Sequence, residues 1–159
     1  MRSLLAALTT CALLYGCSQG HSSDQSAQTG LPTTRIVIDT QNGPVAFTVE
    51  VADDLPSQEK GLMFRTNLAP DAGMIFDFHK PDYQSFWMKN TPLSLDMLFI
   101  KSDGTISTIA ANTIPYSTDP VLSSEPVRAV LEINGGRAYA LDIVPGDKVH
   151  AAMFGNLKQ

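Results

Sequence analysis

Two carboxylates stand inside apolar strands and are the most informative residues of this chain. Asp96 lies between Leu95 and the run Met97–Ile100, and Glu132 lies within Ala129–Ile133. Because apolar side chains surround Asp96 on both sides of its strand, we expect that strand to be buried on both faces. A buried carboxylate is costly unless it is paired and hydrogen-bonded, so both residues need partners or a function.

Cationic, amide and aromatic side chains that could meet these carboxylates occur nearby in the sequence. Lys89 precedes the Thr91-Pro92 corner before Asp96, and Arg65 ends a predicted short helix. One interpretation is a polar network that fixes this corner to the sheet. The other is a pocket for a small polar ligand or glycan, with Trp87 as a stacking wall. The candidate ligand-binding residues are Arg65, Trp87, Lys89, Asn90, Thr91, Asp96 and Glu132.

Catalysis has less support than binding. Two carboxylates can hydrolyse a glycosidic bond when they face each other across a cleft, and Asp96 with Glu132 is the pair to consider. Cationic partners would hold both ionised, which disfavours a general acid. His79 and His150 lie in no nucleophile motif, and the part after Cys17 has no thiol. We therefore assign no catalytic residue and keep a carbohydrate-active hydrolase as an alternative.

One short segment contains residues that could bind a metal ion. Asp77, His79 and Asp82 are three possible ligands within six residues, but Lys80 and Pro81 between them indicate a surface turn. The methionines stand beside Phe, Leu or Ile, which is typical of residues that fill gaps in a core. We expect no metal and no cofactor.

The elements that must position these residues are mostly short strands. Strands are expected at 35–39, 45–51, 73–78, 85–90, 95–101, 106–110, 128–133 and 148–154, with an Asn42-Gly43 hairpin turn after the first. A short helix capped by Ser57 is expected to end near Arg65, and residues 137–143 form one or two helical turns. The fold class is mainly β (β-rich α+β), as a small antiparallel barrel or sandwich with one or two short helices.

The first 33 residues have the composition of a leader and a tether. Arg2 and the apolar run 4–14 are typical of a signal peptide over residues 1–16, and the run is too short to span a bilayer. Gly16-Cys17 resembles the lipobox of bacterial lipoproteins, in which the Cys is lipidated. Residues 17–33 are then the lipidated Cys and a flexible tether, and 34–159 form a single β-rich domain.

The net charge of the chain limits the classes of partner that it is expected to bind. The chain carries 16 acidic and 11 basic residues, for a net charge of −5, which argues against nucleic acid. The expected location is the bacterial cell envelope, anchored to the membrane by lipid at Cys17 and facing the periplasm. Ser18 after the Cys favours the outer membrane, and secretion to the periplasm is the alternative.

The motifs of the folded part resemble the bacterial and archaeal family known as domain of unknown function 192. They are Gly61-Leu62-Met63-Phe64-Arg65, Gly73-Met74-Ile75-Phe76, Phe86-Trp87-Met88-Lys89-Asn90-Thr91, Leu95-Asp96, Val130-Leu131-Glu132 and Pro145-Gly146-Asp147. The resemblance covers about residues 34–154. It implies a compact β-rich barrel or sandwich and no known activity.

These observations favour an envelope-anchored, non-catalytic module that binds a small polar ligand or glycan. The alternatives are the hydrolase above and a structural or assembly partner in an envelope complex, whose protein partner the sequence does not identify.

Overall fold

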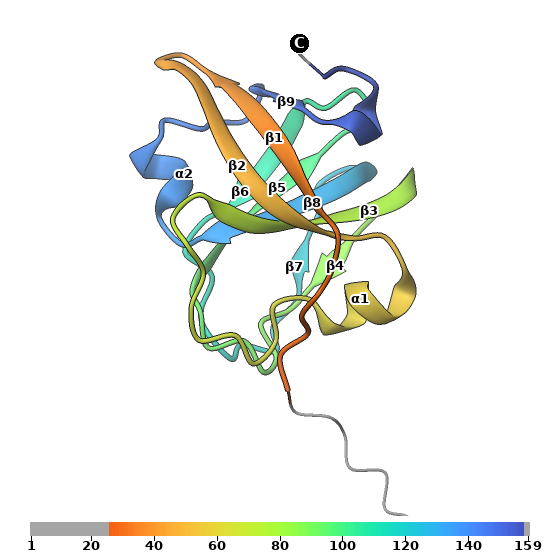
Figure 1. The fold of residues 1–159 in the computed structure, drawn as a ribbon, viewed down its shortest axis with the longest axis vertical. Helices are drawn as coiled ribbons and strands as arrows, with labels where there is room; N and C mark the ends of the chain where they lie inside the picture. Colours follow the sequence, from red (N-terminus) through yellow and green to blue (C-terminus); the bar gives the residue numbers. More distant parts are fainter. Residues whose placement is uncertain (1–25, 158–159) are drawn as a thin grey trace, which may run out of the picture.

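The structure is a computed structural model that describes residues 26–157, so the predicted signal peptide and the predicted lipidation at Cys17 lie outside it. Seven strands form one sheet in the order β6-β5-β8-β3-β2-β1-β9, and β4 pairs with β7 in a second, two-stranded sheet (Figure 1). The bounds of these elements are β1 (Thr33–Thr40), β2 (Gly43–Ala52), α1 (Leu55–Lys60), β3 (Ala72–Asp82), β4 (Ser85–Phe86), β5 (Leu95–Ile100), β6 (Ile106–Ala110), β7 (Val121–Leu122), β8 (Val127–Asn134), α2 (Arg137–Ala140) and β9 (Lys148–His150).

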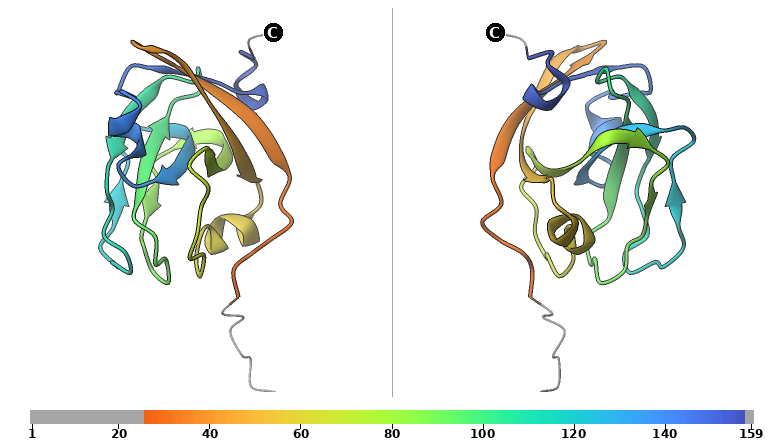
Figure 2. Two further views of the ribbon diagram at one scale, coloured as in Figure 1. Left: turned by 60° about the vertical axis from the view of Figure 1, so that its left-hand side comes forward. Right: turned by 90° about the vertical axis from the view of Figure 1, so that its right-hand side faces the viewer.

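The predicted class is confirmed, with a pairing that the sequence did not predict. Most neighbours are antiparallel, but β2 and β3 run parallel. Parallel strands need a crossover connection, which α1 and the following loop supply. The sheet curls until β6 approaches β9, where an isolated bridge joins Thr105 to Lys148 (Figure 2). The result is a half-barrel.

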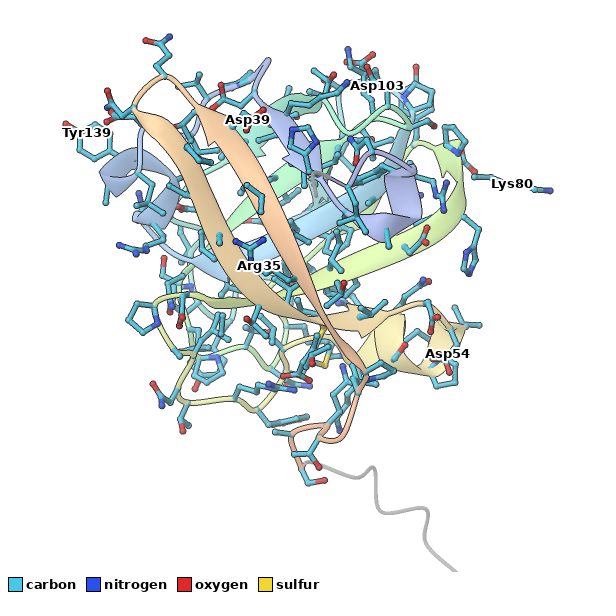
Figure 3. The ribbon with its side chains drawn as sticks, turned by 45° about the horizontal axis from the view of Figure 1, so that its top comes forward. Arg35, Asp39, Asp54, Lys80, Asp103 and Tyr139 are labelled. Atoms are coloured by element: carbon cyan, nitrogen blue, oxygen red, sulfur yellow. The ribbon has the colours of Figure 1, made fainter. Side chains whose placement is uncertain are left out.

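The first hairpin and α1 form where the sequence predicts them, with small differences in the turn and in the helix ends. Thr40 pairs with Gly43, so the tight turn consists of Gln41 and Asn42. The helix is capped by Asp54 rather than Ser57: the Asp54 side chain accepts from the Ser57 backbone N–H at 2.8 Å. Figure 3 shows Asp54 at the start of this helix. The helix ends at Lys60, before the predicted Arg65, and Gly61 follows it with a φ of 49° and a ψ of −138°, a backbone conformation that favours glycine.

The curled sheet separates two apolar cores. One face of β5 and β8 presents Leu98 and Leu131 to a core enclosed by the sheet. The opposite face presents Met97 and Val130 to a second core. All six residues of β5 are buried, which confirms the prediction that both of its faces are covered.

Candidate functional site

Asp96 is buried on the face of β5 that it shares with Leu98, and its partners are backbone amides. Its carboxylate accepts hydrogen bonds from the N–H groups of Asn112 at 2.7 Å, Gly136 at 2.9 Å and Ala138 at 2.8 Å. Gly136 and Ala138 belong to the first turn of α2, whose own N-cap supplies no side-chain cap. Asp96 therefore caps α2 from a neighbouring strand, and this carboxylate is structural.

The predicted cationic partners of Asp96 are wrong. Lys89 is exposed, and its ammonium group lies 5.1 Å from the centroid of the Trp87 ring. Arg65 is held by the carboxylate of Glu50, with Nη2 2.7 Å from Oε2, and by the backbone carbonyl of Gln28 at 2.8 Å. Arg65 thus fastens the segment before β1 to the domain.

The pairing of Asp96 with Glu132 for glycoside hydrolysis is also wrong. Glu132 lies opposite Met97 in the β5–β8 register, whereas Asp96 lies opposite Ile133. Since neighbouring residues of a strand point to opposite faces, the two carboxylates are on opposite sides of the sheet. They cannot flank one glycosidic bond.

Glu132 instead lies in a pocket of about 570 Å³ on the face of the second core. The pocket is walled by the aromatic side chains of Phe76, Phe78, Phe86 and Trp87. Residues of α1 and the turn after it, residues 84–85 and Thr91 complete the lining: Leu55, Gln58, Glu59, Lys60, Gly61, Leu62, Met63, Gln84, Ser85 and Thr91.

The carboxyl group of Glu132 has no partner within residues 26–157. Glu132 is 4% exposed, and no residue of that part of the chain forms a hydrogen bond or an ion pair with its side chain. Its neighbours across the sheet are Met74 of β3 and Met97 of β5. Burial raises the pKa of Glu132 to about 8, because the apolar surroundings disfavour the charged form. At neutral pH the group is mostly the neutral acid.

Close packing of β3 against β8 positions this residue. Gly73 lies beside the Glu132 backbone, and a Cβ there would be 2.5 Å from the Glu132 carbonyl oxygen. Only a residue without a side chain allows this approach. The same strand places Phe76 and Phe78 along the pocket side, so β3 and β8 together form its base.

Aromatic contacts hold the pocket walls in place. The ring centroids of Phe76 and Phe86 lie 5.1 Å apart at an interplanar angle of 90°, and Phe78 contacts Phe86 edge-to-face at 6.3 Å. Such perpendicular pairs stabilise one arrangement of the rings. Phe86 itself belongs to β4, which β7 covers through the pairing of Phe86 with Val121. The long loop before β8 therefore supports a wall of the pocket.

The seven predicted residues fall into two groups. The pocket brings together Trp87, Thr91 and Glu132. Arg65, Lys89, Asn90 and Asp96 do not line it; the amide of Asn90 donates to the sulfur of Met63 at 3.9 Å, behind the pocket wall. The sequence reasoning missed Phe76, Phe78 and Phe86. The alternation of Met74, Phe76 and Phe78 places the first two of them on one strand face, but it does not distinguish a pocket wall from an ordinary core.

The comparisons with known proteins agree with the fold and leave the site unassigned. The family model DUF192, described as "Uncharacterized ACR", matches residues 36–151. The chain belongs to this family. No curated protein matches the chain.

Two solved structures are similar to most of the domain. One is a candidate transcription regulator from Sinorhizobium meliloti 1021, with 45% identity and a TM-score of 0.77, covering 79% of this chain and 98% of that chain. The other is a protein of unknown function from Novosphingobium aromaticivorans DSM 12444, with 44% identity and a TM-score of 0.76, covering 77% of this chain and 88% of that chain.

Proposed function

We propose that this DUF192 protein is a non-catalytic binding module of the bacterial cell envelope, and that its pocket holds one small ligand against Glu132. The observation that supports this most directly is a buried carboxyl group without a partner at the base of an aromatic-walled pocket. Apolar pockets with a few converging polar groups are typical ligand sites.

A purely structural role for Glu132 is disfavoured by its cost. Asp96 shows how this fold satisfies a buried carboxylate, with three backbone donors. Glu132 receives none from the described residues, so an apolar side chain of similar size would suit folding better. A group kept at the expense of stability points to a functional site.

The ligand that suits this lining is mostly apolar, with one polar end. The polar side chains predicted for a glycan site, Arg65, Asn90 and Asp96, are engaged elsewhere. A sugar offers many hydroxyl groups that need partners, and this pocket provides few. The binding function proposed from the sequence is kept, and the glycan is replaced by a compact amphipathic molecule.

The pocket lacks the groups that would turn binding into catalysis. Its lining contains no imidazole or thiol, and the Thr91 hydroxyl donates to the Lys89 carbonyl at 3.2 Å rather than to a base. A neutral carboxylic acid alone can donate a hydrogen bond to a ligand but has no nucleophile to assist.

Anchoring by lipid at Cys17 is part of the proposal and rests on the leader sequence. In the part of the chain that the structure describes, no helix is long and apolar enough to cross a bilayer. Eight residues separate Cys17 from Ser26, so in an anchored protein Ser26 would stay within about 30 Å of Cys17. The net charge of −5 gives no reason to transfer the regulator description of the relative to this chain.

The single tryptophan of the chain tests the proposal directly, because Trp87 lines the pocket and is half exposed. We expect small amphipathic ring compounds from a fragment collection to change its fluorescence saturably, in wild type and in a Glu125→Gln control, whose carboxylate lies by Ser107 and Lys101. Phe86→Ala, which removes one aromatic wall of the pocket, is expected to weaken this response at least about tenfold. No saturable response from any compound would contradict a binding function.

A further inference from the structure

We infer that the group the pocket holds against Glu132 is an organic ammonium ion, carried by an otherwise apolar molecule. This inference rests on the proposed binding function and specifies the charge of its ligand.

Aromatic rings and a thioether make up much of the pocket lining. Four aromatic side chains surround the space, and the thioether of Met63 is part of the lining. Aromatic faces attract cations, and such walls are a recurrent way of holding alkylammonium groups. A neutral apolar ligand would not use this property.

The polar side chains of the lining leave Glu132 without a donor. The Gln58 amide donates to the carbonyl oxygens of Ala52 at 3.3 Å and Asp77 at 2.9 Å. The Thr91 hydroxyl is also directed at a backbone carbonyl. The carboxyl group is thus an acceptor whose complementary donor is to come from the ligand, and a charge-assisted donor forms the stronger bond.

The charged groups around Glu132 do not replace such a ligand. The strands beside it present Met74 and Met97, and the segment after β3 presents Gln84 and Ser85. The other titratable groups of the lining are Glu59 and Lys60 of α1. Desolvation alone accounts for the raised pKa of Glu132, so neither of them stabilises its charged form.

Binding of the cation must therefore expel a proton. The neutral acid of Glu132 loses its proton to solvent, and the resulting carboxylate pairs with the ammonium group. With a pKa of about 8 in the empty pocket, affinity for a permanently charged ligand should rise about 50-fold from pH 6 to pH 8, and binding at pH 7 should release about 0.9 of a proton. A neutral ligand of the same shape would lose affinity, or keep it, as the pH rises.

The experiment compares benzyltrimethylammonium, whose charge does not titrate, with neopentylbenzene, its uncharged isostere. Trp87 fluorescence gives the affinity of each compound for the purified protein from pH 6 to pH 9, and calorimetry in two buffers of different ionisation enthalpy gives the protons released. We expect the ammonium compound to bind more tightly at pH 8, with the pH slope and proton release above. In Glu132→Gln its affinity should fall at least about tenfold and the pH slope should vanish, whereas Glu125→Gln should behave as wild type.

The outcomes distinguish failure of the cationic ligand from failure of the binding function. Equal or tighter binding of neopentylbenzene, or ammonium binding without proton release, would overturn the inference of a cationic ligand and leave the pocket as a binding site. Binding of neither compound would overturn the cationic ligand and also count against the binding function itself. Unchanged ammonium binding in Glu132→Gln would place the cation elsewhere on the molecule.

Discussion

The Asp96→Asn substitution separates the structural carboxylate of this protein from its candidate functional one. Oδ1 of Asp96 accepts two backbone N–H groups and Oδ2 accepts the third. In Asn the oxygen can replace only one of these two atoms. If it takes the place of Oδ1, the new NH₂ group faces the N–H of Ala138, and two donors oppose each other in a buried position.

The expected loss follows from these three bonds. Two bonds change from charge-assisted to neutral, at a cost of roughly 1 kcal/mol each, and the third donor is left unsatisfied at roughly 1–3 kcal/mol. The sum of roughly 3–5 kcal/mol corresponds to a melting temperature about 10–20 °C below wild type for a domain of this size.

Thermal melting by circular dichroism measures this, with Lys89→Met as the matched comparison. Lys89 is exposed, and the one contact described for its side chain is with the Trp87 ring, so its replacement should shift the melting temperature by no more than about 2 °C. Equal losses in the two variants would show that Lys89 and Asp96 form one network. Asp96→Asn melting within about 2 °C of wild type would refute the capping role of Asp96.

Three further predictions follow from the same contacts. The unfolding free energy of wild type should fall by roughly 1.4 kcal/mol per pH unit from pH 5 to pH 8. The reason is that native Glu132 keeps a proton that it releases in the unfolded chain, where its pKa is near 4.5. Urea titrations measure this slope, and Glu132→Gln should lack it. Arg65→Met should leave Glu50 unpaired and remove one of the hydrogen bonds that hold Gln28, whose side-chain amide still donates to the carbonyls of Ser57 and Gly61. Limited proteolysis should therefore cleave before β1 faster than in wild type, and an unchanged cleavage rate would contradict the contribution of Arg65. Trp87→Ala should weaken ligand binding, followed by calorimetry, while its melting temperature stays within about 3 °C of wild type, because the ring is half exposed.

Local signals in the sequence predicted most of the elements. The hairpin of β1 and β2 follows from two β-branched runs around a polar turn, and the burial of β5 on both faces follows from its unbroken apolar pattern. The helix cap was assigned to Ser57 although Asp54 takes that position. Both residues belong to one capping box, which makes either a plausible first residue from sequence alone.

Local sequence signals do not predict the long-range contacts of this fold. The parallel alignment of β2 with β3 depends on where the chain returns after α1, which no local pattern encodes. The amides that satisfy Asp96 lie 16, 40 and 42 residues away, and backbone amides have no identity in a sequence. Side-chain identity alone therefore predicts a cationic partner for Asp96, either Lys89 or Arg65.

The sequence predicted the candidate site only in part. It assigned both buried carboxylates to one site, but Glu132 lines the pocket and Asp96 does not. Glu132 stood out as an acid within an apolar strand, as did Asp96, and the two are distinguished only by the sheet face that each occupies. Trp87 and Thr91 were identified through the segment that follows β4. The phenylalanines of the walls are indistinguishable in sequence from ordinary core residues.

The central claim, that the pocket around Glu132 is a ligand site, is tested most directly by the methyl NMR signals of the methionines. Met63 lines the pocket, whereas Met153 packs against the core enclosed by the sheet. Titration of the ¹³C-methyl-methionine protein with the ammonium compound should shift the Met63 signal saturably and leave that of Met153 in place. A ligand that shifts Met153 and not Met63, or no saturable shift at Met63 with any compound, would contradict the account.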